Sequence, residues 1–131
     1  MLEHYHLTNA ECQLHGRNEY AEFPEAKGQK FDFVLVDGIR RSDCISFALD
    51  HLKPDGLIYL DNSDTDSGGG EMRTAVARLN EAAIEREGAC SSFTDFVPGN
   101  FFGTEGVLVG FGRYEPLLHQ LSSLIKFKSK C

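Results

Sequence analysis

The clearest pattern along the chain is a pair of short apolar segments, each of which ends in an acidic residue. Residues Phe31–Asp37 and Leu57–Asp61 are apolar at successive positions rather than at alternate ones. Such runs, rich in β-branched and aromatic side chains, predict strands that are covered on both faces. Between them, apolar residues recur at helical spacing, namely Ile45, Ala48, Leu49 and Leu52. The pattern therefore predicts strand, helix and strand, with the two strands parallel.

The predicted helices have recognisable ends. Ser42 or Asp43 is expected to cap the first helix, because a short oxygen side chain accepts hydrogen bonds from free backbone N–H groups. The turn Pro54-Asp55-Gly56 is expected to end that helix. A second helix is predicted from Glu71 to Glu87, and Gly88 is expected to form its C-terminal cap.

The last third of the chain predicts an antiparallel pair of strands and a terminal helix. Ser91–Val97 and Gly106–Phe111 are strand-like, and the loop between them is short enough for a hairpin. That loop carries Phe101 and Phe102, which can cap a crevice or pack as core. Apolar residues at helical spacing predict a final helix from 115 to 127.

The N-terminal part is weakly patterned. Glu11–His15 is predicted to be a short strand and Arg17–Ala26 a weak helix. The whole order predicts an α/β fold with a mostly parallel sheet and an antiparallel C-terminal hairpin. A chain of 131 residues is long enough for one domain. We therefore expect a single domain over 1–131, with a strand–helix core at 9–112.

Composition narrows the classes of function. The net charge of −7 argues against binding to nucleic acid, which needs a surplus of basic residues. No apolar run is long enough to span a bilayer, so we expect no membrane contact. No signal peptide is visible, and the expected location is cytoplasmic. The four cysteines are scattered without a CxxC motif, so free thiols are expected.

Candidate chemistry lies where the two predicted parallel strands end. Their carboxyl ends meet at one edge of the sheet, where α/β proteins bind ligands. This edge would bring together Asp37, Asp61 and Asn62, with Asp64 beside them. The residues can serve as turn formers, as contacts for a ligand hydroxyl or amine, or as oxygen ligands for Mg²⁺ or Ca²⁺.

Two arginines and three glycines add further candidates. Arg40 and Arg41 can clamp an anionic group of a ligand or pair with neighbouring acids. We take Arg40 and Asp64 as candidate substrate-binding residues. Gly68-Gly69-Gly70 precedes a predicted helix but lacks the spacing of a phosphate-binding loop, which favours a hinge in a mobile loop from Asn62 to Gly70.

Taken together, these segments resemble the class I S-adenosylmethionine-dependent methyltransferases. Phe31–Gly38 is similar to the fourth strand of that family, and Leu52–Asp64 to its fifth strand. The turn before the fifth strand carries Asp55 where the family has a glycine. Asn9–Gly16 resembles the third strand, and Ser91–Gly112 resembles the closing antiparallel strands.

The resemblance implies a cofactor and roles for several residues. In the cation-dependent O-methyltransferase branch, an Asp after the fourth strand and an Asp-Asn pair after the fifth hold a divalent metal. Asp37, Asp61 and Asn62 match these positions, although Arg40 ends a segment in which that branch has Asp-Ala-Asp-Lys. The resemblance thus implies S-adenosylmethionine, a divalent cation such as Mg²⁺, a small-molecule methyl acceptor and Asp37 as the catalytic residue.

One expected part of the family pattern has no counterpart. Nothing before Phe31 resembles the glycine-rich turn or the acid that bind the methyl donor in the family. In the family, the strand matching Phe31–Val36 lies mid-sheet beside the first strand. The resemblance implies a methyltransferase without its N-terminal donor-binding half, inactive by itself. We expect Phe31–Val36 to pair with a second copy, a complementing chain or Glu11–His15. The alternative is a non-catalytic methyltransferase-like module that binds a partner.

Overall fold

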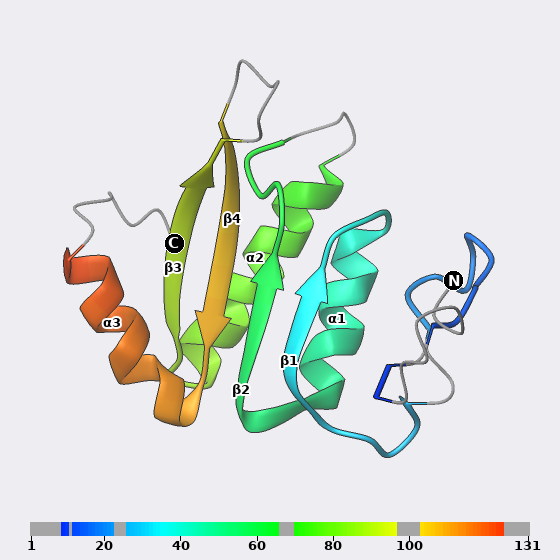
Figure 1. Ribbon diagram of the computed structural model, residues 1–131, viewed down its shortest axis with the longest axis horizontal. Coiled ribbons are helices and arrows are strands. Elements are labelled where there is room, and N and C mark those ends of the chain that lie inside the picture. Colours follow the sequence, from blue (N-terminus) through cyan, green and yellow to red (C-terminus); the bar gives the residue numbers. More distant parts are fainter. Residues whose placement is uncertain (1–8, 11, 23–25, 66–69, 97–102, 125–131) are drawn as a thin grey trace.

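The computed structural model describes residues 9–10, 12–22, 26–65, 70–96 and 103–124, and Figure 1 shows their arrangement. The elements follow in the order β1 (Phe31–Val36), α1 (Arg41–His51), β2 (Leu52–Leu60), α2 (Glu71–Glu85), β3 (Ala89–Asp95), β4 (Thr104–Gly110), a 3₁₀ turn η3 (Gly112–Tyr114) and α3 (Glu115–Leu124). The predicted succession of strands and helices from residue 31 onwards is confirmed.

The strands form one mixed sheet in the order β1-β2-β4-β3. β1 and β2 are parallel, as predicted for strands joined by a helical crossover. β4 runs antiparallel to both of its neighbours, so the predicted closing hairpin is also confirmed. This topology places β1 at one edge of the described sheet and β3 at the other.

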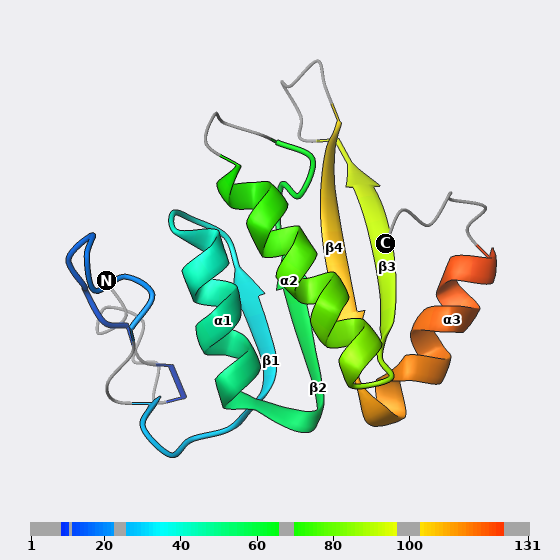
Figure 2. The same cartoon turned by 180° about the vertical axis from the view of Figure 1, so that it is seen from behind.

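Helices α1 and α2 cover one face of the sheet, and they lie behind it in Figure 1 and in front of it in Figure 2. The strand register gives this face an apolar row of Val36, Ile58, Leu60, Val107 and Val109. Ile45 of α1 and Leu79 of α2 are completely buried against it. The core is therefore a single layer between the helices and the sheet.

The other face of the sheet is only partly covered. α3 lies at the β3 end, where Ser91 Oγ donates a hydrogen bond to the Leu118 carbonyl. At the β1 end, the side chains of Phe33 and Leu35 are 52% and 58% exposed. The expectation that β1 is covered on both faces is therefore wrong for the described structure. An apolar run marks a strand, but it does not supply the second covering layer.

Helix α1 begins differently from the prediction. Arg40 precedes the helix in a left-handed conformation, with φ 51°, and no side chain caps the N-terminus. Ser42 and Asp43 lie inside the first turn instead. The Asp43 carboxylate accepts a hydrogen bond from Arg40 Nε at 3.0 Å. This local pairing takes up the side chain that was expected to cap the backbone.

The end of α2 is a Schellman motif with an unexpected residue at its centre. The N–H of Gly88 donates to the Ala83 carbonyl at 2.7 Å, and the N–H of Glu87 donates to Ile84 at 3.4 Å. Glu87, rather than Gly88, takes the left-handed conformation. Gly88 serves close packing, because a Cβ there would lie 2.7 Å from Cδ1 of Phe111.

Two further expectations need correction. The segment 12–16 is not a strand, and Leu14 within it is fully exposed. Residues 17–21 of the predicted helix Arg17–Ala26 form turns, and its residues 23–25 lie outside the described residues. β2 begins at Leu52, but its pairing with β1 jumps from Leu52 to Leu57, so the turn at 54–56 forms a bulge within the strand.

Some expectations fall on segments for which only part is described. Residues 66–69, with two of the three glycines, and the aromatic pair at 101–102 lie outside the described residues. The terminal helix is described as far as Leu124.

Cys12 and Cys44 are free thiols as expected, whereas Cys90 takes part in a disulfide. None of the helices in the described ranges has both the length and the apolar character needed to cross a membrane.

Candidate functional site

The candidate site lies at the carboxyl edge of β1 and β2. Val36 and Leu60 are paired at the ends of these strands, and the N–H of Asp61 donates to the Val36 carbonyl at 3.1 Å. Asp37 and Asp61 therefore follow neighbouring parallel strands at the same edge, as predicted. The geometry concentrates acidic side chains at the place where open α/β sheets bind ligands. Their chemical roles stay predictions.

Arg41 links the two loops that leave this edge. Its Nη2 donates to Asp37 Oδ1 at 3.2 Å and to Asn62 Oδ1 at 3.4 Å. Only 17% of the Arg41 side chain is exposed, against 56% for Asp37. The first residue of α1 thus places a positive charge between an acid that follows β1 and an amide that follows β2.

Asp61 and Asn62 are positioned by β2 and its turn. Asn62 has φ 52°, a left-handed conformation that asparagine tolerates better than most residues. Asp61 Oδ1 accepts a hydrogen bond from the Tyr59 hydroxyl at 3.4 Å. Gly106 of β4 leaves room for that tyrosine, because a Cβ at Gly106 would lie 1.9 Å from its hydroxyl oxygen.

The predicted metal ligands do not fit a divalent cation well. A hard cation needs free oxygen ligands, usually six or more including water. The Oδ1 atoms of Asp37 and Asn62 already accept hydrogen bonds from the Arg41 guanidinium. The arrangement favours an internal ion pair.

The two candidate substrate-binding residues have partners within the chain. Arg40 forms a 2.9 Å salt bridge with Asp43 and donates to the carbonyls of Arg17 and Asn18. Asp64 Oδ1 accepts the backbone N–H of Glu105 at 2.9 Å. Arg40 thus attaches the N-terminal segment to α1, and Asp64 attaches the loop after β2 to β4. Both contacts support the edge rather than leave a group directed at a ligand.

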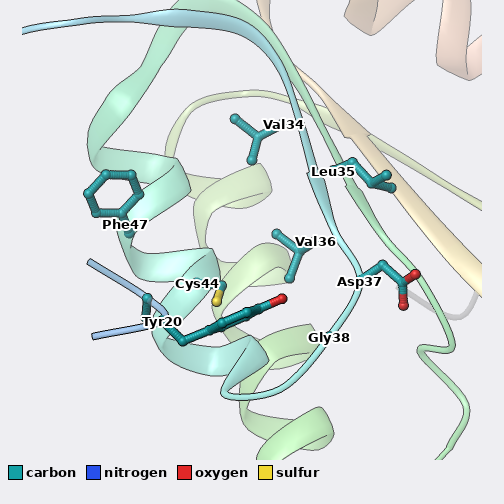
Figure 3. Close-up of a pocket in the computed structure, with 9 residues that line it drawn as sticks. Tyr20, Val34, Leu35, Val36, Asp37, Gly38, Cys44 and Phe47 are labelled. Carbon is teal, nitrogen blue, oxygen red and sulfur yellow. The ribbon is translucent and has the colours of Figure 1, made fainter. Parts of the chain in front are cut away.

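A cavity of about 220 Å³ lies beside the edge strand, between β1, α1 and the N-terminal segment. Figure 3 shows Val34, Val36, Cys44 and Phe47 around it, with the Tyr20 ring across one end and the Asp37 carboxylate directed away. The walls are therefore mainly apolar. This cavity suits an uncharged group better than a charged one.

Gly38 and Cys44 shape this cavity. A Cβ at Gly38 would lie 2.3 Å from the Tyr20 hydroxyl oxygen, so the glycine permits the tyrosine to approach. Burial raises the pKa of the Cys44 thiol above its ordinary value, and the nearby Asp43 charge acts in the same direction. At neutral pH this thiol is protonated and is a weak nucleophile.

A second hollow of about 260 Å³ lies on the other side of the edge. It is lined by residues of the loop after β2 and the start of α2, namely Ser63, Asp64, Thr65, Met72 and Arg73. Its wall is more polar than that of the first cavity. The carboxyl edge of β1 and β2 is therefore flanked by one apolar and one polar hollow.

Three residues of this region were not singled out as site residues from the sequence. Arg41 was considered only together with Arg40, and the pattern contains no signal that distinguishes the two. Tyr20 lies in a segment without periodicity, so nothing located it. Tyr59 reads as an ordinary strand residue. Only contacts between distant segments reveal these residues.

Comparison with solved structures identifies a similar fold. The O-methyltransferase from Bacillus cereus, solved in complex with S-adenosylhomocysteine, aligns with TM-score 0.51 and 15% identity, over 67% of this chain and 44% of that one. The O-methyltransferase TomG from Streptomyces achromogenes, involved in tomaymycin synthesis and solved with S-adenosylmethionine, aligns with TM-score 0.47 and 20% identity, over 71% and 44%. No protein-family model and no curated protein matches.

The Bacillus cereus likeness confirms the predicted fold class, an α/β mixed sheet of the Rossmann-like methyltransferase type. At 15% identity it shows the fold and not the activity. The chain spans less than half of the length of either protein it resembles.

Proposed function

We propose that this chain forms one part of a class I S-adenosylmethionine-dependent methyltransferase that acts on a small-molecule acceptor. The observation that carries the proposal is the sheet itself. A parallel β1–β2 pair is followed by an antiparallel β3–β4 hairpin, and the fold aligns with an O-methyltransferase solved with S-adenosylhomocysteine. Acidic and amide side chains occupy the carboxyl edge, where such a reaction would take place.

Asp37 is the proposed catalytic residue. It follows the edge strand directly, and more than half of its side chain is exposed. A carboxylate there can accept a proton from an acceptor hydroxyl or orient it toward a methyl group. Arg40 and Asp64 were the proposed substrate contacts, but their internal partners make them better suited to holding the loops around an acceptor.

The methyl donor would bind mainly to other polypeptide. Close approach to the donor needs backbone without side chains, and its ribose needs a carboxylate partner. No segment before Phe31 resembles the glycine-rich turn or the acid with which the family binds its donor. In the described part of the chain, the Tyr20 hydroxyl group occupies the space beside Gly38. We therefore propose that a complementing segment or chain supplies most of the donor site.

The edge of β1 is the proposed attachment site for that polypeptide. β1 pairs only with β2 in the described sheet, and its Phe33 and Leu35 side chains are exposed. An unpaired strand edge beside exposed apolar side chains is prone to further strand pairing. Self-association through this edge is the competing outcome. A divalent cation is not part of the proposal, because Arg41 engages two of its three expected ligands.

Calorimetric titration of the 131-residue chain with S-adenosylmethionine tests this proposal. We expect no binding in the micromolar range by the isolated chain, because no segment before Phe31 resembles the family's donor-binding turn or acid. We expect micromolar binding once a complementing polypeptide is joined to the N-terminus or added in trans. Micromolar binding by the isolated chain would show that the donor site is already present.

A matched variant separates donor binding from catalysis in the complemented protein. Asp37→Asn should lower the rate of methyl transfer by about 10²–10⁴-fold, the range typical of a lost proton-transfer group. It should leave the affinity for S-adenosylhomocysteine within a few-fold of the original. Full activity of this variant would remove Asp37 from the mechanism.

A further inference from the structure

We infer that the Arg41 guanidinium is the resident cation of the carboxyl edge and takes the position in which a divalent metal would bind Asp37 and Asn62. The inference goes beyond the proposed function and does not depend on methyl transfer. It concerns how the loops after β1 and β2 are held together. It also predicts that these two loops are held together without a bound metal ion.

The geometry supplies the first argument. A single nitrogen, Arg41 Nη2, lies 3.2 Å from Asp37 Oδ1 and 3.4 Å from Asn62 Oδ1. These two oxygens come from different loops, and a metal would have to bind both. The guanidinium thus bridges the loops in the way a cation would. Its distances are those of hydrogen bonds, which hold the loops less tightly than metal coordination does.

Burial supplies the second argument. The Arg41 side chain is only 17% exposed, and its Nε atom is buried without a hydrogen-bond partner among the described residues. Because Arg41 is the first residue of α1, the helix fixes where its side chain starts. A guanidinium is a permanent cation. A divalent cation would therefore meet a permanent positive charge that cannot readily move into solvent.

Neighbouring arginine Arg40 provides a matched comparison. It precedes Arg41 directly and carries the same charge, but it pairs with Asp43 and the N-terminal segment instead. If charge alone excluded a metal, loss of either arginine would have the same effect. If the position of Arg41 matters, only its loss should open the site.

Paramagnetic broadening by Mn²⁺, a hard cation that accepts oxygen ligands as Mg²⁺ does, tests the inference. The side-chain amide signals of Asn62 are followed by NMR, and those of the exposed Asn18 serve as the reference. The full chain, Arg41→Met and Arg40→Met are each titrated to about 1 mM, which brackets the weak binding expected of a site with at most three protein ligands. Circular dichroism checks that each variant is folded.

In the unmodified chain and in Arg40→Met, Asn62 should broaden no more than Asn18. In Arg41→Met, the Asn62 signals should broaden at a Mn²⁺ concentration at least about tenfold lower than in the unmodified chain, because one adjacent positive charge has been removed. Selective broadening of Asn62 in the unmodified chain would overturn the inference. So would a folded Arg41→Met without the gain, or the same gain in Arg40→Met. If Arg41→Met does not fold, Arg41→Gln replaces it, and the titration of the unmodified chain still decides.

Discussion

At the scale of single residues, the space available for side chains constrains this edge as much as charge does. Gly106 of β4 lies under the Tyr59 ring, and a Cβ there would approach three atoms of that side chain within 2.7 Å. Tyr59 in turn hydrogen-bonds Asp61. The glycine therefore helps to set the position of a site carboxylate from a neighbouring strand.

Replacement of Gly106 by alanine should lower the free energy of unfolding by about 1–3 kcal/mol, the usual cost of overpacking. The tyrosine ring must move, since the methyl group cannot share its space. Urea denaturation measures the change. Gly16→Ala is the control, because the nearest atom to a Cβ there is 3.9 Å away. A second change, Tyr59→Val, should recover much of the loss, and no recovery would contradict this explanation.

Cys44 offers a test of burial beside the apolar cavity. Since burial raises the pKa of its thiol, the reactive thiolate should form only at alkaline pH, with a midpoint above the ordinary value of 9.0. Alkylation by iodoacetamide, followed by mass spectrometry, should modify the exposed Cys12 well before Cys44. A ligand in the cavity should slow modification of Cys44 further. Equal rates at the two cysteines at pH 8 would argue against a buried Cys44.

At the scale of the elements, Glu87 and Gly88 have different structural roles at the C-terminal end of α2. Glu87 adopts the left-handed conformation, although it pays a steric penalty there that glycine does not. Gly88 follows in a position where a Cβ would lie 2.9 Å from the Gly110 carbonyl oxygen. The left-handed position of the Schellman motif thus accepts a side chain at some cost, whereas the packing of Gly88 against Gly110 and Phe111 leaves no room for one.

Two substitutions at this point should have opposite effects. Glu87→Gly should stabilise the protein by about 0.5–1 kcal/mol, because it relieves the left-handed strain. Gly88→Ala should destabilise it by about 1–3 kcal/mol, because the new Cβ meets backbone that cannot rotate away. Thermal unfolding followed by circular dichroism compares the two variants. If both substitutions changed the stability in the same direction, this explanation of Glu87 and Gly88 would be wrong.

The exposed salt bridge between Asp32 of β1 and Lys53 of β2 gives a pH signature at the same scale. The Lys53 ammonium, 2.8 Å away, lowers the pKa of Asp32 in β1 below its ordinary value of 3.8. The pKa of Asp32 is lower in the folded state than in the unfolded state. The ion pair therefore stabilises the protein fully at a pH above the unfolded-state pKa. This stabilisation is lost as the pH falls through the folded-state pKa. Asp32→Asn should remove that small, acid-side part of the stability curve, as measured by denaturation between pH 2 and 5. Unchanged curves would mean that solvent fully screens the pair.

At the scale of the whole molecule, the half-covered sheet is the dominant feature. α1 and α2 cover one face of the sheet, and β1 is an edge strand of the described sheet (Figures 1 and 2). The Phe33 and Leu35 side chains of β1 are exposed. Natural edge strands usually carry charged residues or bulges that discourage pairing. Apart from the irregularity near Phe31, this edge is apolar in its C-terminal half.

We expect the isolated chain to self-associate through this edge when no complementing polypeptide is present. Leu35→Lys, which places a charge on the exposed face, should shift sedimentation toward monomer by at least about tenfold in dissociation constant, roughly 1.4 kcal/mol. The same substitution at the exposed Ile84 of α2 is the control, because it lies away from β1. Equal effects at both positions would point to nonspecific apolar contact.

The sequence by itself determined the elements from Phe31 onwards, the parallel pair and the closing hairpin. It also located Asp37, Asp61 and Asn62 at one edge, because strand ends in a parallel pair coincide whatever the packing. These features follow from spacing over a few residues, where side-chain periodicity reports directly on burial. The weakly patterned segment before β1 gave no such signal, and the described part of the strand predicted at Glu11–His15, residues 12–15, is not a strand.

Only the tertiary structure decided which groups meet. Arg40 and Arg41 are neighbours of equal charge, yet one pairs with Asp43 and the other spans Asp37 and Asn62. Likewise, positions 38 and 106 require glycine because a Cβ there would overlap the side chain of Tyr20 or Tyr59, which comes from a distant segment. Side-chain direction and clearance depend on where separate elements are placed in space, so a linear pattern does not encode them locally. For that reason the sequence left a metal role open for Asp37 and Asn62, and only the structure revealed the Arg41 guanidinium between them.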